Sequence, residues 1–235
     1  MNRYSRQTML SEIGEDGQRK IRQSSVLVIG AGGLGSAVCT YLVAAGIGKL
    51  FIIDADTVSI DNLQRQVLYR ENQVGKPKSI TAQKSLQGLN SDVEIIAIQD
   101  YFSAKNAEEL VKNIDIVIDA CDNFKTRYLI NDICVALDKP FIYGAISEFS
   151  GQLSVFNYQR GSTYRCLFPD EEEMIASQKT VVGVFGVLPS IIGSLQVNEA
   201  IKLITNCGRP LVNKLFTINL KNNQTNILEI AGRSL

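Results

Sequence analysis

The chain has 235 residues, 45% of them hydrophobic, which is enough material for one α/β domain with a large core. Its 24 basic and 24 acidic residues cancel, and this argues against attraction to nucleic acid or to a membrane by bulk charge. It has no histidine, which excludes any mechanism that needs an imidazole of this chain as base, nucleophile or metal ligand.

The cysteines are odd in number, scattered, and form no C-x-x-C pair: Cys39, Cys121, Cys134, Cys166 and Cys207. This pattern is typical of a reducing compartment, so we expect a cytoplasmic protein without a disulfide framework. No apolar run approaches the roughly 18 residues that a membrane span needs, so we expect no membrane partner.

The N-terminal segment 1–10 carries Arg3 and Arg6 around Tyr4 among polar residues, which by itself is typical of a frayed, solvated terminus. A short surface helix is predicted over residues 11–23, where Ile13 and Ile21 stand among charged residues.

Residues 26–56 are the strongest local pattern, with an apolar run that leads directly into a glycine-rich turn. A small and apolar stretch then extends to residue 45, and a second apolar run ends on Asp54. The order is strand, turn, helix, strand and acid, in which glycines let the backbone approach a phosphate and the acid accepts a ribose hydroxyl. We therefore expect a nucleotide site that includes Gly30, Gly32, Gly33, Gly35 and Asp54.

Apolar and helical segments alternate over the rest of the chain. The predicted elements are a polar excursion over 57–72, helix 77–89, strand 93–98, helix 103–112, strand 114–120, helix 124–137, strands 139–145 and 151–156, helix 189–205 and hairpin 214–230. Residues 157–182 lack a clear period, so we predict a long functional or mobile loop there. The fold expected is α/β: one domain over 1–235, a Rossmann-like, doubly wound, mostly parallel sheet with an antiparallel C-terminal extension.

The polar residues that follow the glycine unit favour a triphosphate over a dinucleotide. Asp56 and the arginine-bearing excursion with Arg65 come directly after the ribose acid, and a dinucleotide site needs no such segment. Lys78 opens the next helix and can place a point charge on a phosphate. Asp122 follows a strongly apolar, central strand and is suited to Mg²⁺, which prefers oxygen ligands.

Seven segments, taken in order, resemble the ThiF/MoeB/HesA family, the bacterial relatives of ubiquitin-activating enzymes, and are most similar to ThiF. They are RYSRQ (3–7), GAGGLG (30–35), DADTVSIDNLQRQ (54–66), GKPK (75–78), CDN (121–123), YRCLFPD (164–170) and GSLQVNEAIKLI (193–204). The resemblance implies an ATP- and Mg²⁺-dependent adenylyltransferase that activates the C-terminal glycine of a small ubiquitin-like sulfur carrier. It also implies a homodimer in which Arg6 reaches the partner's site, contrary to the frayed terminus expected above.

Carried over to this sequence, the resemblance gives Arg65, Lys78, Asp122 and Arg6 as catalytic residues, with Asp122 as the Mg²⁺ ligand. The residues that it implies for nucleotide binding are Gly30, Gly32, Gly33, Gly35, Asp54, Asp56, Asp61, Asn62, Leu63, Gln64, Arg65, Gln66, Lys78, Asp122 and Asn123.

Two cysteine features of the family are missing from this sequence. Many members hold zinc with two C-x-x-C pairs, but Thr163 replaces the first cysteine of one pair and the second pair is absent, so we expect no zinc. Lys179 stands where many members have a cysteine in the crossing loop, about 157–182. We therefore expect the chain to stop at the acyl-adenylate and a separate sulfurtransferase to follow.

Several alternatives remain open. The carrier is ThiS-like, for thiamin thiazole biosynthesis, or MoaD-like, for molybdenum cofactor biosynthesis, and the YRCLFPD segment and compact length favour ThiS. A non-catalytic scaffold or dimer partner is disfavoured because the phosphate- and metal-facing positions hold suitable residues. An NAD-linked oxidoreductase is disfavoured by the missing histidine and by the segment at 62–66.

Overall fold

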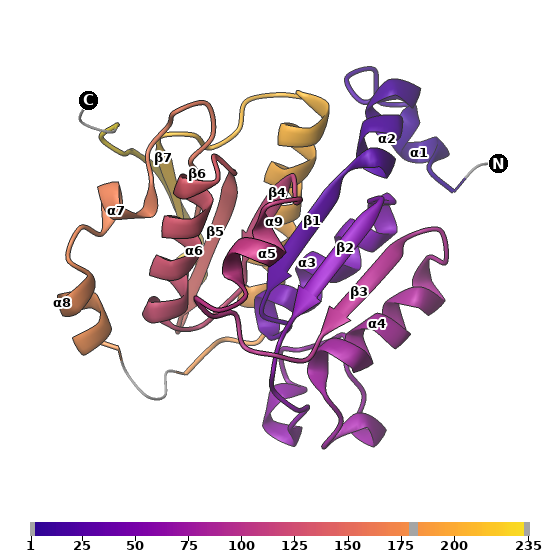
Figure 1. Cartoon of the computed structure of the whole chain (residues 1–235), viewed down its shortest axis with the longest axis horizontal. Helices are drawn as coiled ribbons and strands as arrows, with labels where there is room; N and C mark the ends of the chain where they lie inside the picture. Colours follow the sequence, from indigo (N-terminus) through magenta and orange to yellow (C-terminus); the bar gives the residue numbers. More distant parts are fainter. Residues whose placement is uncertain (1–2, 179–182, 233–235) are drawn as a thin grey trace.

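The computed structural model describes residues 3–178 and 183–232, and the strands of this part form one eight-stranded sheet (Figure 1). The strands are β1 (Ser25–Ile29), β2 (Lys49–Ile53), β3 (Glu94–Ile98), β4 (Ile116–Asp119), β5 (Phe141–Ser147), β6 (Ser150–Phe156), β7 (Lys214–Asn219) and β8 (Gln224–Glu229). Their order is β3-β2-β1-β4-β5-β6-β7-β8. The first five are parallel and the pairs from β5 onward are antiparallel, which confirms the predicted fold class.

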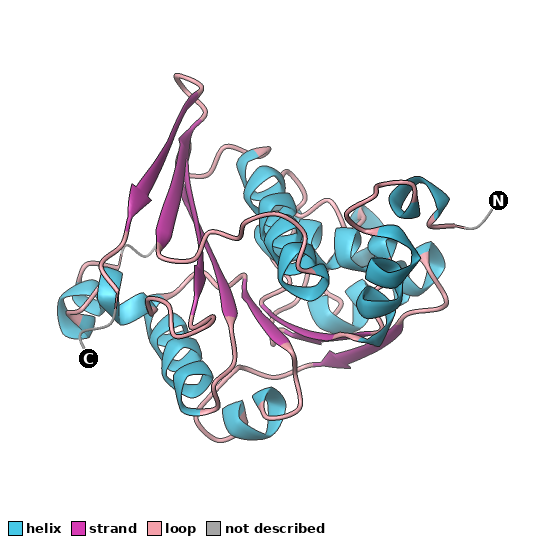
Figure 2. Ribbon diagram, turned by 90° about the horizontal axis from the view of Figure 1, so that it is seen from above, coloured by secondary structure: helices cyan, strands magenta, loops and turns pink. Residues whose placement is uncertain are grey.

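Helices cover both faces of the sheet (Figure 2). They are α1 (Ser5–Thr8), α2 (Gly14–Gln23), α3 (Gly33–Ala45), α4 (Lys78–Leu89), α5 (Ala107–Val111), α6 (Phe124–Ala136), α7 (Tyr164–Leu167), α8 (Glu171–Ala176) and α9 (Leu188–Thr205), with 3₁₀ turns η1 (Ile60–Asn62) and η2 (Glu71–Gln73). The helices α2, α3, α4 and α9 pack on one face, while α5 and α6 pack on the other, with α7 and α8 against α6. Among the described helices, none combines the length and apolar character needed to cross a membrane.

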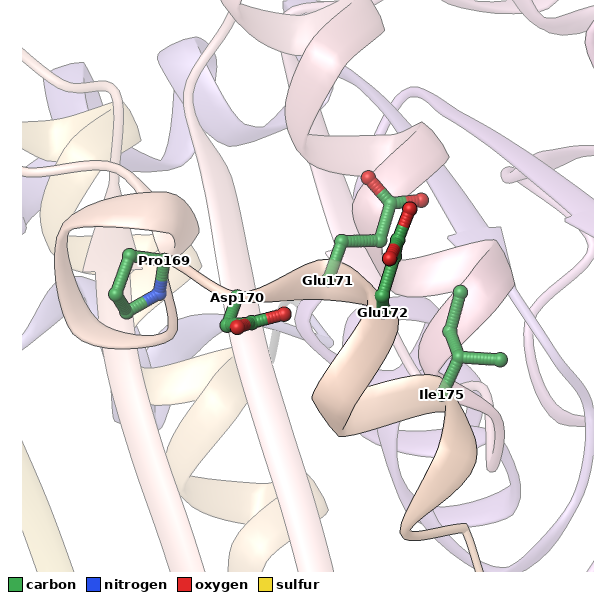
Figure 3. A pocket seen from close by; sticks show the side chains of 5 residues that line it. All are labelled: Pro169, Asp170, Glu171, Glu172 and Ile175. Carbon is green, nitrogen blue, oxygen red and sulfur yellow. The ribbon is translucent and has the colours of Figure 1, made fainter.

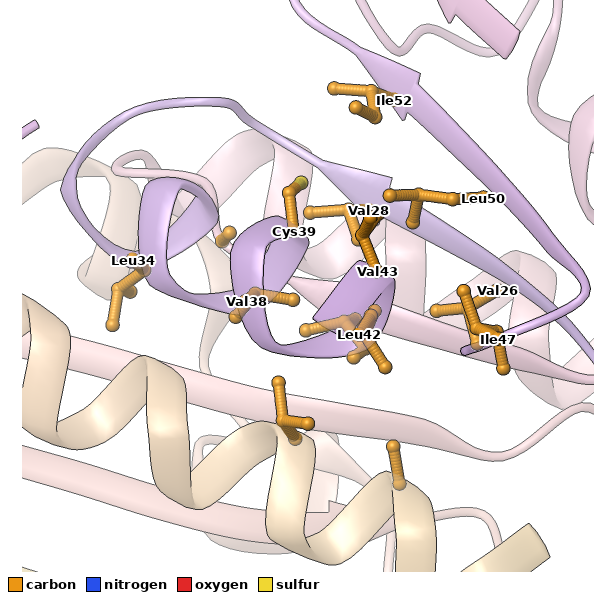
Figure 4. Close-up of a cluster of buried hydrophobic side chains, with 14 of the residues drawn as sticks. Val26, Val28, Leu34, Val38, Cys39, Leu42, Val43, Ile47, Leu50 and Ile52 are labelled. Atoms are coloured by element: carbon orange, nitrogen blue, oxygen red, sulfur yellow. The ribbon is translucent and has the colours of Figure 1, made fainter. Parts of the chain in front are cut away.

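The alternation of β1 explains why its apolar run has no polar face. Val26 and Val28 belong to the cluster beneath α3 and α9, whereas Leu27 and Ile29 belong to the cluster beneath α5 and α6. Successive side chains of a strand point to opposite faces, so a strand covered on both sides is apolar throughout. Figure 4 shows the first cluster, in which Val38 and Leu42 of α3 lie with Val26 and Val28.

Two of the expectations for irregular segments are wrong. The N-terminal segment is not frayed at Tyr4, because this side chain is buried against Gly46. Its hydroxyl accepts a hydrogen bond from Asn90 Nδ2 at 2.9 Å. Within the described part of the segment, residues 157–178, the chain forms α7 and α8 rather than a continuous loop. The helix expected over 103–112 is shortened to Ala107–Val111, because Asn106 Oδ1 accepts the Ser103 N–H at 2.9 Å and closes a turn instead.

Candidate functional site

The sheet order changes direction beside β1, whose neighbours β2 and β4 are both parallel to it. In open α/β sheets the crevice at the carboxyl ends of such strands is where ligands bind. Figure 1 shows these ends at the bottom of the view, with the violet excursion that links β2 and α4 below them. The glycine turn, Asp54, the excursion and Cys121–Asn123 all leave strands at this edge.

The glycine turn presses against the end of β4. Gly30 has a φ of +99°, and a Cβ there would lie 2.6 Å from the carbonyl oxygen of Ala120. A Cβ on Gly35 would lie 2.0 Å from the carbonyl oxygen of Gly30. Gly32 precedes α3 and Gly33 begins it, so the free N–H groups at the start of this helix face the edge.

Asp54 fastens the glycine turn to the end of β2. Its carboxylate accepts the Ala31 N–H at 2.7 Å and the Asp56 N–H at 2.8 Å, so each oxygen already holds one backbone donor. Burial raises the pKa of Asp54 above its ordinary value, and these two donors oppose the rise. The remaining lone pairs of both oxygens stay available to a ribose hydroxyl.

The excursion lays Arg65 and Gln66 under the glycine turn. Arg65 Cγ lies 3.7 Å from the Cβ position of Gly33, and its guanidinium donates to the carbonyl oxygen of Asp61 at 3.0 Å. Gln66 is buried, with Nε2 3.6 Å from the Cβ position of Gly32, and its Oε1 has no partner among the described residues. Both side chains therefore border the glycine turn.

The other predicted residues of the excursion have mainly local roles. Asn62 is buried and forms a capping box with Ser59, whose hydroxyl also donates to Asp61. Leu63 packs against the hydrophobic core, and Gln64 lies against Gly186. These contacts hold the excursion in its conformation.

Lys78 begins α4 and brings a buried ammonium group to the same edge. Its Nζ lies 2.9 Å from Asp56 Oδ2, an ion pair in which the lysine side chain is 8% exposed and the aspartate 59%. Asp56 therefore offsets part of the lysine charge that a phosphate would otherwise face.

Asp122 and Asn123 follow β4 at this edge. Asp122 is exposed, and its carboxylate has no hydrogen bond or ion pair within the part of the chain that the structure describes. Asn123 instead caps α6, because its Oδ1 accepts the Thr126 N–H at 2.8 Å. A single free carboxylate suits Mg²⁺, which keeps several waters when one protein ligand and phosphates hold it.

Arg6 lies away from the nucleotide edge of its own chain. Its neighbour Gln7 contacts the carbonyl oxygen of Ala45, the last residue of α3, while Gly33 begins the same helix. A helix of 13 residues is about 20 Å long, and Arg6 stands at the far end of it. The structure thus unites the other predicted catalytic residues at one edge but does not bring Arg6 to them.

Four polar residues that were not predicted from the sequence support this edge. Tyr69 donates to the carbonyl oxygen of Ala31 at 2.7 Å, and Ser79 Oγ donates to that of Asp54 at 3.1 Å. Asp119 and Arg127 form a buried ion pair of 2.7 Å beneath Cys121. An acid that ends an apolar strand and an arginine one turn into the next helix were the available signal for that pair.

The cysteines offer no nucleophile at this edge. Burial raises the pKa of Cys121 well above its ordinary value, which leaves the thiol protonated. Cys166 Sγ contacts the Thr163 hydroxyl at 3.3 Å, and no group of three metal-ligating side chains is found among the described residues. The absence of zinc stays a prediction, and Lys179 lies outside the described residues.

Two surface hollows lie at α8 and along α9. One of about 670 Å³ is lined by the start of α8, where Figure 3 shows Asp170, Glu171 and Glu172 beside Pro169 and Ile175. The other, of about 650 Å³, lies along one side of α9 from Val187 to Asn198. None of the predicted site residues lines either hollow.

The chain is similar to proteins of known family and to solved structures. The chain matches the ThiF family over residues 4–234. It is 45% identical to a sulfur carrier protein adenylyltransferase of Thermus thermophilus, over 92% of this chain and 82% of the relative. It is 41% identical to the adenylyltransferase and sulfurtransferase MOCS3-1 of Zea mays over 99% of this chain, but spans about half the length of that relative (50%).

Solved structures share the fold. The crystal structure of E. coli MccB with ATP superposes with a TM-score of 0.88 at 25% identity, covering 99% of this chain and 72% of MccB. The crystal structure of PaaA gives a TM-score of 0.84 at 26% identity, covering 97% of this chain and 82% of PaaA. The chain therefore belongs to the ThiF family and is an ATP-dependent adenylyltransferase.

Proposed function

We propose that the chain joins AMP to the C-terminal glycine carboxylate of a small ubiquitin-like sulfur-carrier protein and releases pyrophosphate. The observation that carries this proposal is the meeting of the glycine turn, Arg65, Lys78 and the free carboxylate of Asp122 at one sheet edge. A triphosphate needs an anion-binding helix start, cations and a metal ligand together, and a scaffold needs none of them. The name of the Thermus relative supports the choice of substrate.

In this proposal the carrier's carboxylate oxygen attacks the α-phosphorus of ATP, a bond to AMP forms, and the bond to pyrophosphate breaks. The attacking carboxylate is already ionised at neutral pH, so the reaction needs no general base. The absence of histidine from the chain is consistent with this mechanism. Arg65 and Lys78 hold the phosphates in line and neutralise charge on the leaving pyrophosphate. Mg²⁺, when held by Asp122, supplies further neutralisation of the phosphate oxygens.

Arg6 completes the proposed site only in a homodimer. Because Arg6 stands about one helix length from the glycine turn of its own chain, the role assigned to it requires a partner subunit. Most soluble homo-oligomers are closed and two-fold symmetric, so each subunit would lend its arginine to the other.

The carrier is proposed to be ThiS-like, with a MoaD-like carrier as the second candidate. The second candidate is supported by a probable molybdopterin-synthase adenylyltransferase of Porphyra purpurea, 45% identical over 86% of this chain. A separate sulfurtransferase is proposed to act next, because Lys179 stands where the family resemblance leads us to expect a cysteine in the crossing loop.

ATP–pyrophosphate exchange with each purified carrier tests the proposal. We expect exchange with a carrier that ends in Gly-Gly, accompanied by an AMP adduct in its mass spectrum, and none with the same carrier lacking its last glycine. Exchange with one carrier and not the other decides between the two candidates. Absence of exchange and adduct with both would refute the proposed function.

A further inference from the structure

We propose that the buried Asp119–Arg127 pair is a positioning device that aims Asp122 at Mg²⁺ by holding both polar groups of the Cys121 backbone. The inference rests on the proposed function of Asp122. Asp119 ends β4 and Arg127 lies in the first turn of α6, so the pair joins the two elements that flank Cys121–Asn123. No predicted site residue belongs to this pair.

The pair hydrogen-bonds both the N–H and the carbonyl group of Cys121. Asp119 Oδ1 accepts the Cys121 N–H at 3.1 Å, and its Oδ2 accepts Arg127 Nε at 2.7 Å. Arg127 Nη2 donates to the Cys121 carbonyl oxygen at 3.0 Å and contacts that of Gly144 at 3.5 Å. The carbonyl of Cys121 belongs to the peptide unit that leads into Asp122, so the orientation of this unit is fixed by the guanidinium.

The residues on either side leave Asp122 little freedom. Before it, Gln196 of α9 donates to the Asp119 carbonyl oxygen at 2.6 Å and contacts that of Ile142 at 3.2 Å, which secures the end of β4. After it, the side chain of Asn123 caps α6. Asp122 is therefore a free, exposed carboxylate on an anchored backbone. Mg²⁺ requires near-ideal octahedral coordination, so a ligand for it must be held in a fixed position.

Neither the helix dipole nor a gain in stability explains why this pair is charged. A cation in the first turn of a helix lies at the unfavourable end of the helix dipole, and Arg127 is 6% exposed there. A buried ion pair is weak support for stability, because apolar side chains of similar volume often serve as well. Apolar side chains could not, however, accept the Cys121 N–H and donate to its carbonyl, and this is the function that the geometry supplies.

Arg127→Lys is the informative variant, because it keeps the charge and loses the forked donor. Residues that orient metal ligands typically change metal affinity 10–100-fold when replaced. We expect Arg127→Lys and the isosteric Asp119→Asn to weaken Mn²⁺ binding in the presence of ATP, without carrier, by about tenfold or more, as measured by electron paramagnetic resonance. The Mg²⁺ concentration for half-maximal pyrophosphate exchange should rise in parallel.

Arg165→Lys is the matched control. Arg165 of α7 donates two hydrogen bonds, at 2.7 and 2.8 Å, to the carboxylate of Asp132, which lies on α6 as Arg127 does. It should leave Mn²⁺ affinity within about twofold of wild type, the usual effect of a surface pair. A structural role alone would lower the melting temperature of Arg127→Lys and leave Mn²⁺ affinity unchanged well below that temperature. Wild-type affinity in folded Arg127→Lys would overturn the inference, and Asp119→Asn decides if Arg127→Lys does not fold. Wild-type protein that binds Mn²⁺ and ATP but never exchanges pyrophosphate would instead refute the proposed function.

Discussion

Asp122 and Arg65 differ from most charged groups at the sheet edge because little of the fold depends on them. Asp122 is exposed, and the one side-chain hydrogen bond of Arg65 among the described residues goes to the Asp61 carbonyl oxygen. We expect Asp122→Ala and Arg65→Ala to lower pyrophosphate exchange by about 10²–10³-fold or more, the scale for losing one preorganised electrostatic contact. Thermal unfolding should stay near wild type, as it should for Asp92→Ala, an exposed control that keeps its activity. Near-normal exchange in either variant, with carrier present, would remove that residue from the mechanism.

A position can require glycine because its φ is positive or because another part of the backbone lies too close for a Cβ. Gly30 and Gly75 allow these two reasons to be distinguished. Both have positive φ, +99° and +85°, but a Cβ on Gly75 meets no atom within 4 Å while one on Gly30 meets the Ala120 carbonyl oxygen at 2.6 Å. We expect Gly75→Ala to lower the free energy of unfolding by about 1 kcal/mol, from backbone strain alone. Gly30→Ala should lower it by about 3 kcal/mol, since the end of β4 must also move. Equal losses in urea denaturation would show that the close approach does not matter.

The residues at the edge differ in how far the sequence could reveal them. Asp54, Lys78 and Asp122 could be predicted because each follows a clear strand or opens a clear helix, and parallel strands end at one edge. Asn123 could be placed at that edge but not given its role, since helix capping depends on where α6 begins. The ion pair of Asp119 and Arg127 had a signal in the sequence, but its hydrogen bonds to the Cys121 backbone could not be predicted, because a sequence does not display backbone partners.

At the scale of elements, the residues around the start of α8 are typical of a helix N-terminus, although the segment is too polar to show a helical period. Asp170 caps it by accepting the Glu173 N–H at 2.9 Å, and three glutamates fill its first turn, where the helix dipole favours them. The short helix α7 follows Thr163, which forms a capping box with Cys166, but it has no acidic residue in its first turn. Its buried Tyr164 packs on Tyr128 with ring centroids 5.1 Å apart, so tertiary contacts rather than local pattern determine it.

The Arg165–Asp132 pair ties α7 to α6 and makes a pH-dependent contribution to stability. The hydrogen bonds from Arg165 lower the pKa of Asp132 below its ordinary value, so the unfolded chain binds a proton more readily than the folded one. The stabilisation is therefore complete above about pH 4, the usual aspartate pKa, and is lost as pH falls through the lowered value. Because Asp132 is 50% exposed, solvent screening keeps the contribution near 1 kcal/mol or below.

Urea denaturation of Asp132→Asn from pH 3 to pH 7 measures this contribution. The difference in unfolding free energy from wild type should be present at pH 7 and should shrink as pH falls below about 4. Asp92→Asn, at an exposed position for which the described part of the chain shows no ion pair, should show no such trend. A constant difference across the range would mean that Asp132 acts through something other than its charge.

At the scale of the whole molecule, the nucleotide edge and α1 lie at opposite ends of the parallel strands, as Figure 1 shows with α1 at the top and the excursion at the bottom. Tyr4, against Gly46, and Gln7, beside Ala45, hold α1 at the amino-terminal end of the sheet. Within one chain, Arg6 and Asp122 therefore cannot meet at the same phosphate, and a catalytic role for Arg6 requires a second copy.

Mixing two inactive variants tests whether Arg6 acts across such a dimer. Arg6→Ala keeps an intact nucleotide edge but lends no arginine, and Asp122→Ala lends the arginine but lacks the metal ligand. In a two-fold dimer, half of the re-equilibrated molecules pair one variant with the other, and each of these holds one complete site. The mixture should therefore regain about a quarter of wild-type exchange, while each variant alone stays inactive. An arginine acting within its own chain would leave the mixture as inactive as its parts, and an Arg6→Ala protein that keeps wild-type exchange would exclude Arg6 from the site altogether.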